Sequence, residues 1–243
     1  MLTFPFPIPG TFKRVLALAA GLAAGCGMAG SAGAYTALCI HNKTGKTRIS
    51  DSCRVKETAV VVPSSVPLTC AAGGTCAVGD TGPGGGIVFY DAGSPQSWGR
   101  YLEAAPNTWT GGSADPNIEW CDNVSTFLPG PAIGVTSAAH THTAIGWGWS
   151  NTVLMAAHCT HGAANAVRGY HGGGKSDWFL PSLDELYEMY VQRNLVGGGF
   201  GGNVYWSSSE ADGGSAWGQY FGDGFQNFAG KGATLGVRPA RAF

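Results

Sequence analysis

DWFLPSLDELYEMY, residues 177–190, carries the clearest local structure signal in the chain. Ser182 and Glu185 have the spacing of a capping box, in which each residue's side chain satisfies a free backbone N–H at the start of a helix. Asp184 and Glu185 also place negative charge at the positive end of the helix dipole. One apolar face follows from residues at helical spacing, which are Leu183, Leu186, Tyr187 and Tyr190. The segment therefore predicts a helix that begins after Ser182 and packs on a core.

Strand-like segments lie on both sides of this helix. Upstream, residues 87–90 form a strong β run after a Gly-rich turn, and residues 101–104 are a second candidate strand. Residues 151–170 are rich in Ala and predict further helix with a break near Gly162. Three β-prone runs close the chain, at 204–210, 215–232 and 235–243, with a turn signal at Asp223-Gly224. This order predicts an α+β fold, with two helices set to one side of an antiparallel sheet.

The N-terminus has the features of an export signal. Two basic residues, an apolar run at 15–30 and small residues at 32–34 follow one another in the order of a secretory signal peptide. The sequence therefore predicts a signal peptide at 1–34 and a mature chain that starts at Tyr35 and contains no membrane span. Two alternatives stay open: the run is a buried core helix, or Cys26 is acylated and anchors a lipoprotein.

The cysteines agree with export to an oxidising compartment. Beyond the predicted signal their number is even, which is typical of a disulfide framework in a secreted protein. They are Cys39, Cys53, Cys70, Cys76, Cys121 and Cys159. Many pairings are open in principle, and local organisation favours Cys39–Cys53, Cys70–Cys76 and Cys121–Cys159. The absence of a C-x-x-C motif argues against a zinc site.

Composition divides the mature chain into three parts. Residues 35–62 predict a small β-hairpin unit with a turn at 42–46 and a cysteine near each end, closed by a disulfide. Residues 63–76 are rich in Pro, Ser and Gly and predict a linker. Residues 77–243 predict the α+β domain.

Charge and composition argue against a nucleic-acid-binding protein and against a disordered chain. The net charge is -1 and charged residues make up 12% of the chain, so we expect no nucleic-acid partner. With 40 Gly and 8 Trp, the chain predicts many turns around an aromatic core rather than disorder.

The chain contains acidic residues and histidines, but they do not form a recognisable catalytic motif. There is no G-x-S-x-G nucleophile elbow. A glycosidase needs two carboxylates at a defined separation. The spacing of the acidic residues does not single out such a pair from Asp177, Asp184, Glu185, Glu210, Asp212 and Asp223. The spacings of His140 with His142 and of His158 with His161 suit a metal, yet these residues are interpreted as ordinary polar side chains. We therefore expect no enzyme activity, no cofactor and no bound metal.

Five motifs together resemble a known family. In chain order they are GDTGPGGGIVFYD (79–91), WGRYLEAAP (98–106), SDWFLPSLDEL (176–186), YWSSSE (205–210) and VRPARAF (237–243). This set resembles the C-terminal domain of the Legionella collagen-like adhesin family, formerly a domain of unknown function. The resemblance covers about 77–243 and implies a C-type-lectin-like fold, a surface location, binding of sulfated glycosaminoglycans and trimer formation. The segment around Cys39 and Cys53 is similar to a hairpin found ahead of such domains in exported bacterial proteins.

The chain also departs from related patterns. Residues 79–84 hold only about two collagen-like triplets, so a collagen stalk is not implied and a homo-oligomer stays open. The E-P-N, Q-P-D and W-N-D motifs of calcium-dependent lectins are absent, so we expect no calcium chelation. Formylglycine-generating enzymes have a related fold, but their activity depends on late cysteines, and none follows Cys159.

The candidate ligand site is a turn-rich region near the C-terminus. It combines aromatic rings, which stack on sugar C–H faces, with side chains that pair with hydroxyls. The predicted ligand-binding residues are Tyr220, Asp223, Phe225, Gln226, Asn227 and Lys231. The loop of Trp147 and Trp149 is the second choice. Of the neighbouring residues, Trp206, Trp217 and Phe221 are assigned to the core. Arg238 and Arg241 either add positive charge to the site or pair with buried carboxylates.

These observations predict an exported bacterial recognition module of adhesin type, secreted or located at the cell surface. Its expected partner is an extracellular glycan, with a sulfated polysaccharide as one candidate, or a surface protein. The alternative is a structural or protein-binding module of an envelope assembly.

Overall fold

The structure is a computed structural model of the chain. It describes residues 36–50, 54, 57–62, 68–129 and 141–243. Two compact units are present, Met1–Val66 and Pro67–Phe243, and each is described by itself. The predicted signal peptide with Cys26, and the predicted mature start at Tyr35, lie outside the described residues. In the part of the chain that is described, no helix is both long and apolar enough to cross a bilayer.

The first unit is a small antiparallel sheet with strand order β2-β1-β3. Its strands are β1 (Thr36–His41), β2 (Thr47–Ser50) and β3 (Glu57–Val62). The predicted turn at 42–46 joins β1 to β2, and Gly45 takes a positive φ of 66° there. The third strand pairs with the other side of β1 and so enlarges the hairpin. The expected Cys39–Cys53 bridge lies outside the described residues.

The second unit mixes strands and helices, which confirms the predicted α+β class. Its strands are β4 (Ile87–Gln96), β5 (Gly99–Ala104), β6 (Asn117–Glu119), β7 (Val204–Glu210), β8 (Ser215–Tyr220), β9 (Gln226–Gly230), β10 (Thr234–Gly236) and β11 (Ala240–Ala242). Its helices are η1 (Cys70–Ala72), α1 (Gly148–His158), α2 (Ala163–Arg168), η2 (Gly172–Gly174), α3 (Leu183–Val191) and α4 (Arg193–Val196). Each of the five segments predicted as strand contributes to at least one of these strands, and residues 215–232 and 235–243 contribute to two each.

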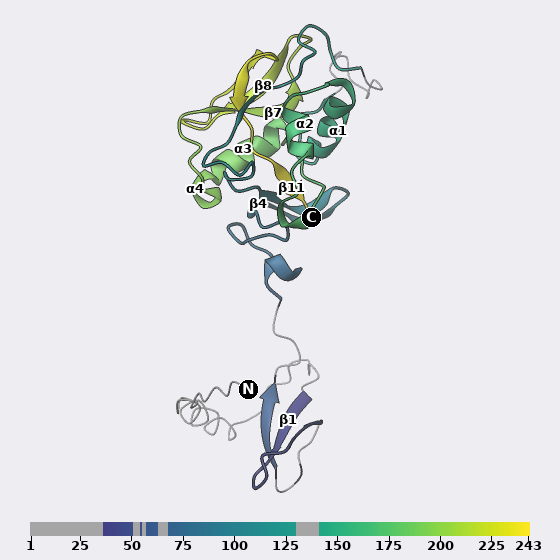
Figure 1. The fold of residues 1–243 in the computed structure, drawn as a ribbon, viewed down its shortest axis with the longest axis vertical. Coiled ribbons are helices and arrows are strands. Elements are labelled where there is room, and N and C mark those ends of the chain that lie inside the picture. Colours follow the sequence, from purple (N-terminus) through teal and green to yellow (C-terminus); the bar gives the residue numbers. More distant parts are fainter. Residues whose placement is uncertain (1–35, 51–53, 55–56, 63–67, 130–140) are drawn as a thin grey trace, which may run out of the picture. The chain divides into compact units, whose positions relative to one another are not determined.

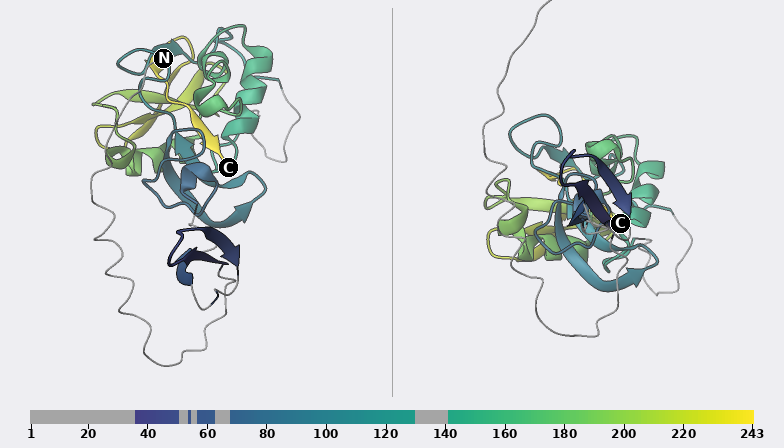
Figure 2. Two further views of the ribbon diagram at one scale, coloured as in Figure 1. Left: turned by 60° about the horizontal axis from the view of Figure 1, so that its bottom comes forward. Right: turned by 90° about the horizontal axis from the view of Figure 1, so that it is seen from below.

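Two sheets organise this unit. The larger has strand order β6-β10-β7-β8-β9 and is antiparallel except between β10 and β7. The smaller has the order β11-β5-β4, so the last strand of the chain pairs beside the first long hairpin of the unit. Figures 1 and 2 show β11, in yellow, beside the blue-teal β4–β5 hairpin. The beginning and the end of the unit therefore share one sheet.

Helices α1 and α2 pack on each other, and α1 also packs on β7 (Figure 1). The predicted break between them is confirmed at Gly162, where φ is 137°. A Cβ atom there would lie 2.6 Å from the carbonyl oxygen of Trp120, so only glycine fits.

The predicted capping box at the start of α3 is also confirmed. Ser182 Oγ accepts a bond from the Glu185 N–H at 3.4 Å, and Glu185 Oε2 accepts one from the Ser182 N–H at 2.8 Å. Helix α3 contacts β4, β7 and β8, and its buried residues Leu186 and Met189 lie on the face that packs against the core.

Large aromatic side chains fill the core. Trp120, Trp178 and Trp206 anchor one buried cluster, and Phe221 belongs to a second one. Burying each such side chain stabilises the fold by roughly 1.5–3 kcal/mol. Trp206 and Phe221 are core residues, as predicted. Trp217 is only partly buried and lies edge-on against Phe228, with ring centroids 5.6 Å apart.

Buried ion pairs connect the motifs on which the family resemblance rests. Glu103 accepts hydrogen bonds from the backbone N–H groups of Gly84, at 2.9 and 3.1 Å, and of Gly86, at 3.1 Å. Arg241 donates to Glu103 at 2.8 Å and to Asp177 at 2.6 Å. A side chain at Gly84 or Gly86 would collide with this carboxylate or its strand. The Gly-rich turn is therefore folded around a buried acid.

A second pair joins Arg238 to Asp115, with Nη2–Oδ2 at 2.6 Å, and Tyr205 donates to the same carboxylate at 2.7 Å. Burial beside Asp115 raises the pKa of the Tyr205 hydroxyl. Of the two roles considered for Arg238 and Arg241, the structure supports pairing with buried carboxylates.

Candidate functional site

The predicted ligand-binding residues divide into groups with different surroundings. Tyr220 ends β8 and is half-buried, while Asp223 and Phe225 belong to the exposed turn that follows. Phe225 is 62% exposed, and its backbone N–H donates to Asp223 Oδ1 at 2.9 Å. Gln226 and Asn227 lie in edge strand β9, where Asn227 is exposed. These five residues lie in or beside the turn that joins β8 to β9.

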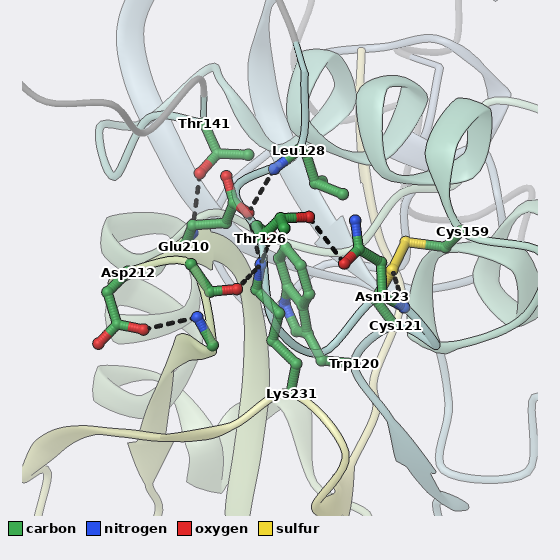
Figure 3. Close-up of polar contacts among 12 residues, drawn as sticks. Trp120, Cys121, Asn123, Thr126, Leu128, Thr141, Cys159, Glu210, Asp212 and Lys231 are labelled. Atoms are coloured by element: carbon green, nitrogen blue, oxygen red, sulfur yellow. Dashed lines mark hydrogen bonds and ion pairs between the residues drawn. A yellow bond between two sulfur atoms is a disulfide. The ribbon is translucent and has the colours of Figure 1, made fainter.

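Lys231 does not belong to this group, because its side chain is fully buried. Its ammonium group donates to Glu210 Oε1 at 2.7 Å, to the Thr126 carbonyl at 2.9 Å and to the Gly213 carbonyl at 3.0 Å (Figure 3). It also lies 5.0 Å from the ring centre of Trp120. An opposite charge and further acceptors offset the cost of burying an ammonium group. The expected exposure of Lys231 is therefore wrong.

A pocket of about 500 Å³ lies elsewhere, at the second-choice loop. Its tryptophans come from two distant segments: Trp98 from the β4–β5 turn, and Trp147 and Trp149 from the start of α1. The lining residues are Ser97, Trp98, Ile145, Gly146, Trp147, Trp149, Ser150, Asp177, Phe179, Glu185 and Ala242. This combination of a wide apolar wall with a few polar groups is typical of small-ligand sites.

Neighbouring groups hold each indole in place. Trp147 stacks on His142, with ring centroids 3.8 Å apart. The Arg168 guanidinium lies 4.5 Å from the ring centre of Trp149. Trp98 packs against Gly146 so closely that a Cβ atom would overlap the indole. The aromatic walls are therefore positioned before any ligand arrives, which reduces the ordering cost of binding.

Glu185 connects the two helix starts beneath this pocket. Its Oε1 accepts from the backbone N–H groups of Gly146, at 2.8 Å, and Gly148, at 3.4 Å, while Oε2 accepts from Ser182. Burial raises the pKa of this carboxyl to about 7, against the opposing effect of the three N–H donors. A side chain at Gly148 would collide with Glu185 and Phe179, so the close approach of α1 requires glycine.

Asp177 supplies the more accessible carboxylate of the wall. Its side chain is 47% exposed, and Oδ1 accepts from Arg241 Nε at 2.6 Å. Ser97 and Ser150 are the hydroxyl-bearing residues of the lining. The pocket thus offers aromatic faces, hydroxyls and a carboxylate to a ligand.

The two carboxylates of the lining do not form the opposed pair that glycoside hydrolysis uses. Glycoside hydrolysis requires a carboxylic acid that can donate a proton and a second carboxylate opposite it. Both oxygens of Glu185 already accept backbone N–H bonds, and the side chain is fully buried. Asp177 alone does not supply both groups.

The histidines highlighted by their spacing do not converge on one point. His142 stacks on Trp147, and His161 lies 3.4 Å from Glu119 and 3.7 Å from Asp122. His158 ends α1 on the exposed surface, and His140 lies outside the described residues. Among the described residues, one three-residue group has metal-ligand spacing, but its cysteines form a disulfide.

Two of the three favoured disulfides are confirmed. They are Cys70–Cys76 and Cys121–Cys159. The second ties the segment after β6 to the end of α1 (Figure 3), where Thr160 donates to Asp122. Bridges of this kind indicate an oxidising environment such as the extracellular space.

From the sequence, the loop of Trp147 and Trp149 was the second choice for the ligand site, and Trp98 was not among the predicted site residues. A signal was present, since Trp98 opens the motif that contains Glu103, and Trp147 and Trp149 each follow a glycine. No protein-family model matches the chain, and a search of curated proteins finds no significant relative. The family resemblance therefore rests on the quoted motifs.

Proposed function

We propose that this protein is an exported recognition module of bacterial cell-surface type that binds a glycan in the tryptophan-lined pocket. The observation that carries the proposal is the positioning of Trp98, Trp147 and Trp149 beside Ser97 and Asp177. Indole faces stack on the C–H faces of a sugar ring, and hydroxyl and carboxylate oxygens accept bonds from its hydroxyls. The pocket volume of about 500 Å³ is large enough for a small-molecule-sized ligand such as one or two sugar rings.

A C-type-lectin-like fold of the adhesin family is part of this proposal. Two observations support it. The first and last strands of the unit share the small sheet β11-β5-β4. In addition, Glu103 accepts from the Gly-rich turn and from Arg241, and Arg241 also donates to Asp177, so four of the five resembling motifs meet in one network.

Under this proposal, glycan binding does not require calcium. The polar groups of the pocket are hydroxyls and two carboxylates, and one of these, Glu185, is buried with both oxygens engaged. A calcium ion takes six to eight oxygen ligands. We therefore propose that recognition depends on stacking and hydrogen bonding, and that a chelator leaves it unchanged.

Export and surface location belong to the same proposal. The Cys121–Cys159 and Cys70–Cys76 bridges and the predicted signal at 1–34 support a secreted or surface-held protein. Mass spectrometry of the exported material distinguishes a start at Tyr35 from an acylated Cys26. Retention of Met1 in functional exported protein contradicts the signal peptide.

One observation favours a second function, a protein-binding module of an envelope assembly. Phe225 and Phe228 are 62% and 53% exposed on the β8–β9 side of the larger sheet, and Trp217 lies against Phe228. Exposed aromatic residues at a sheet edge are common in protein interfaces. Under this alternative, Phe228→Ala weakens partner capture and Trp149→Ala does not.

A glycan array tests the main proposal directly. The mature protein is screened with and without EDTA and at two salt concentrations, beside the Trp149→Ala variant. We expect EDTA-independent binding to a restricted set of glycans, and its loss in the variant. The absence of any glycan binding by the folded wild-type protein contradicts the proposal.

A further inference from the structure

The charge of the pocket lining narrows the class of glycan. The charged residues that line it are Asp177 and Glu185, both acidic, and no Lys, Arg or His is among the lining residues. A sulfate group placed there would meet the carboxylate of Asp177, and no cation of the lining would pair with it. The lining thus opposes the sulfated ligand that the family resemblance implies.

Two cations lie beside the lining residues: Arg168 over the ring of Trp149, and Arg241 bonded to Asp177. Arg241 is shared between Asp177 and the buried Glu103, so one positive charge serves two carboxylates. Its Nε donates to Asp177 Oδ1, and in the part of the chain that the structure describes, no group donates a hydrogen bond to Asp177 Oδ2. Because the side chain is 47% exposed, this second oxygen can accept from a ligand.

The tryptophans add a second preference for positive charge. The face of an indole carries negative potential and attracts ammonium groups, most strongly where water is excluded. Trp98 and Trp147 line the same pocket as Asp177 and offer such faces. The Arg168 guanidinium already occupies one face of Trp149, and His142 stacks on one face of Trp147, so these contacts hold both rings in position.

We propose that the sugar bound in this pocket carries a free ammonium group, as in a de-N-acetylated amino sugar, and that sulfated glycans are disfavoured. This inference rests on the proposed function, because it assumes that a glycan occupies the pocket. The ammonium group donates to Asp177 while the sugar ring stacks on an indole. N-acetylation removes the charge and leaves the stacking.

Calorimetric titration with two matched oligosaccharides tests the inference. The probes are the glucosamine tetramer and its fully N-acetylated counterpart, with a heparin tetrasaccharide as the sulfated probe. We expect the glucosamine tetramer to bind about tenfold more tightly than the acetylated one, since one charge-assisted contact contributes about that factor. The heparin fragment is expected to bind more weakly than both.

Substitution of Asp177 by Asn tests the role of its negative charge in binding, because the two side chains have nearly the same shape. Asp177→Asn is expected to lower the affinity for the glucosamine tetramer about tenfold and the affinity for the acetylated tetramer by less than about threefold, because the amide oxygen of Asn still accepts from a sugar hydroxyl. Asp212→Asn, on an exposed turn away from the lining, is the matched control and keeps both affinities. Melting curves verify that Arg241, which still pairs with Glu103, keeps the variant folded.

Each outcome has a separate meaning. Equal affinities for the two tetramers, or tighter heparin binding, overturn the ammonium inference. If the acetylated tetramer binds and Trp149→Ala abolishes that binding, the glycan function itself stands. If neither tetramer, nor any arrayed glycan, binds the folded protein, both proposals fall.

Discussion

The replacement of Lys231 by Met tests whether this residue is structural. The side chains of Lys231 and Glu210 are both 0% exposed, and their charges lie 2.7 Å apart. Removing one partner of such a pair leaves a buried charge uncompensated, which costs about 3–5 kcal/mol. For a domain of this size, each kcal/mol lowers the melting temperature by about 2–4 °C. We therefore expect the melting temperature to fall by roughly 6–20 °C.

The assay is thermal and urea unfolding of the exported protein under non-reducing conditions, followed by circular dichroism. A matched control is Lys175→Met, at a half-buried lysine outside this network, where the change is expected to stay within about 0.5 kcal/mol. The double variant Lys231→Met with Glu210→Gln removes both charges and should recover much of the loss. Glycan binding by the folded single variant, measured well below its melting temperature, should be unchanged.

Two results would refute this reasoning. A cost below about 1 kcal/mol for Lys231→Met would show that the pair does not stabilise the fold. If Lys231→Met lost glycan binding with an unchanged melting temperature, Lys231 would be a ligand-binding residue after all.

The other predictions concern stability. Replacing Cys121 and Cys159 by Ala should cost about 4 kcal/mol, since the bridge closes a segment of 38 residues, and denaturant curves measure it; an unchanged midpoint refutes the bridge. The pKa of Glu185 is raised to about 7, so the folded protein binds more protons than the unfolded chain between about pH 4.5 and 7. Stability should therefore fall on the order of 3 kcal/mol as the pH rises from 4.5 to 8, and Glu185→Gln should flatten this dependence in urea titrations. Ser182→Ala should cost about 1 kcal/mol through the lost helix cap, and a melt indistinguishable from wild type would contradict the capping box.

Local signals were enough to predict much of the secondary structure. The capping box of Ser182 and Glu185 and the break at Gly162 depend on contacts within a few residues or on backbone conformation, which sequence patterns report directly. Strand segments were found for the same reason. The pairing of β10 with β7 and of β11 with β5 joins distant segments, and no local pattern encodes it.

The candidate site was harder to predict because it depends on long-range packing. Lys231 lies in a turn-rich segment, which suggests exposure, but its acceptors include Thr126, which is 105 residues away. Trp98 and Trp147 belong to one pocket only because Gly146 lets the two segments approach and Glu185 fixes the loop. Sequence showed the aromatic residues but not which of them meet.

Binding calorimetry on Trp149→Ala tests the central claim most directly. Trp149 is 39% exposed, so its replacement should leave the fold intact. With a glycan selected on the array, we predict that Trp149→Ala lowers the affinity by about tenfold or more, as expected for a lost stacking contact worth roughly 0.5–1.5 kcal/mol together with its apolar burial. The melting temperature should not change, and Phe225→Ala should bind like the wild type. Full affinity in Trp149→Ala, with binding lost in Phe225→Ala, would contradict the pocket as the glycan site.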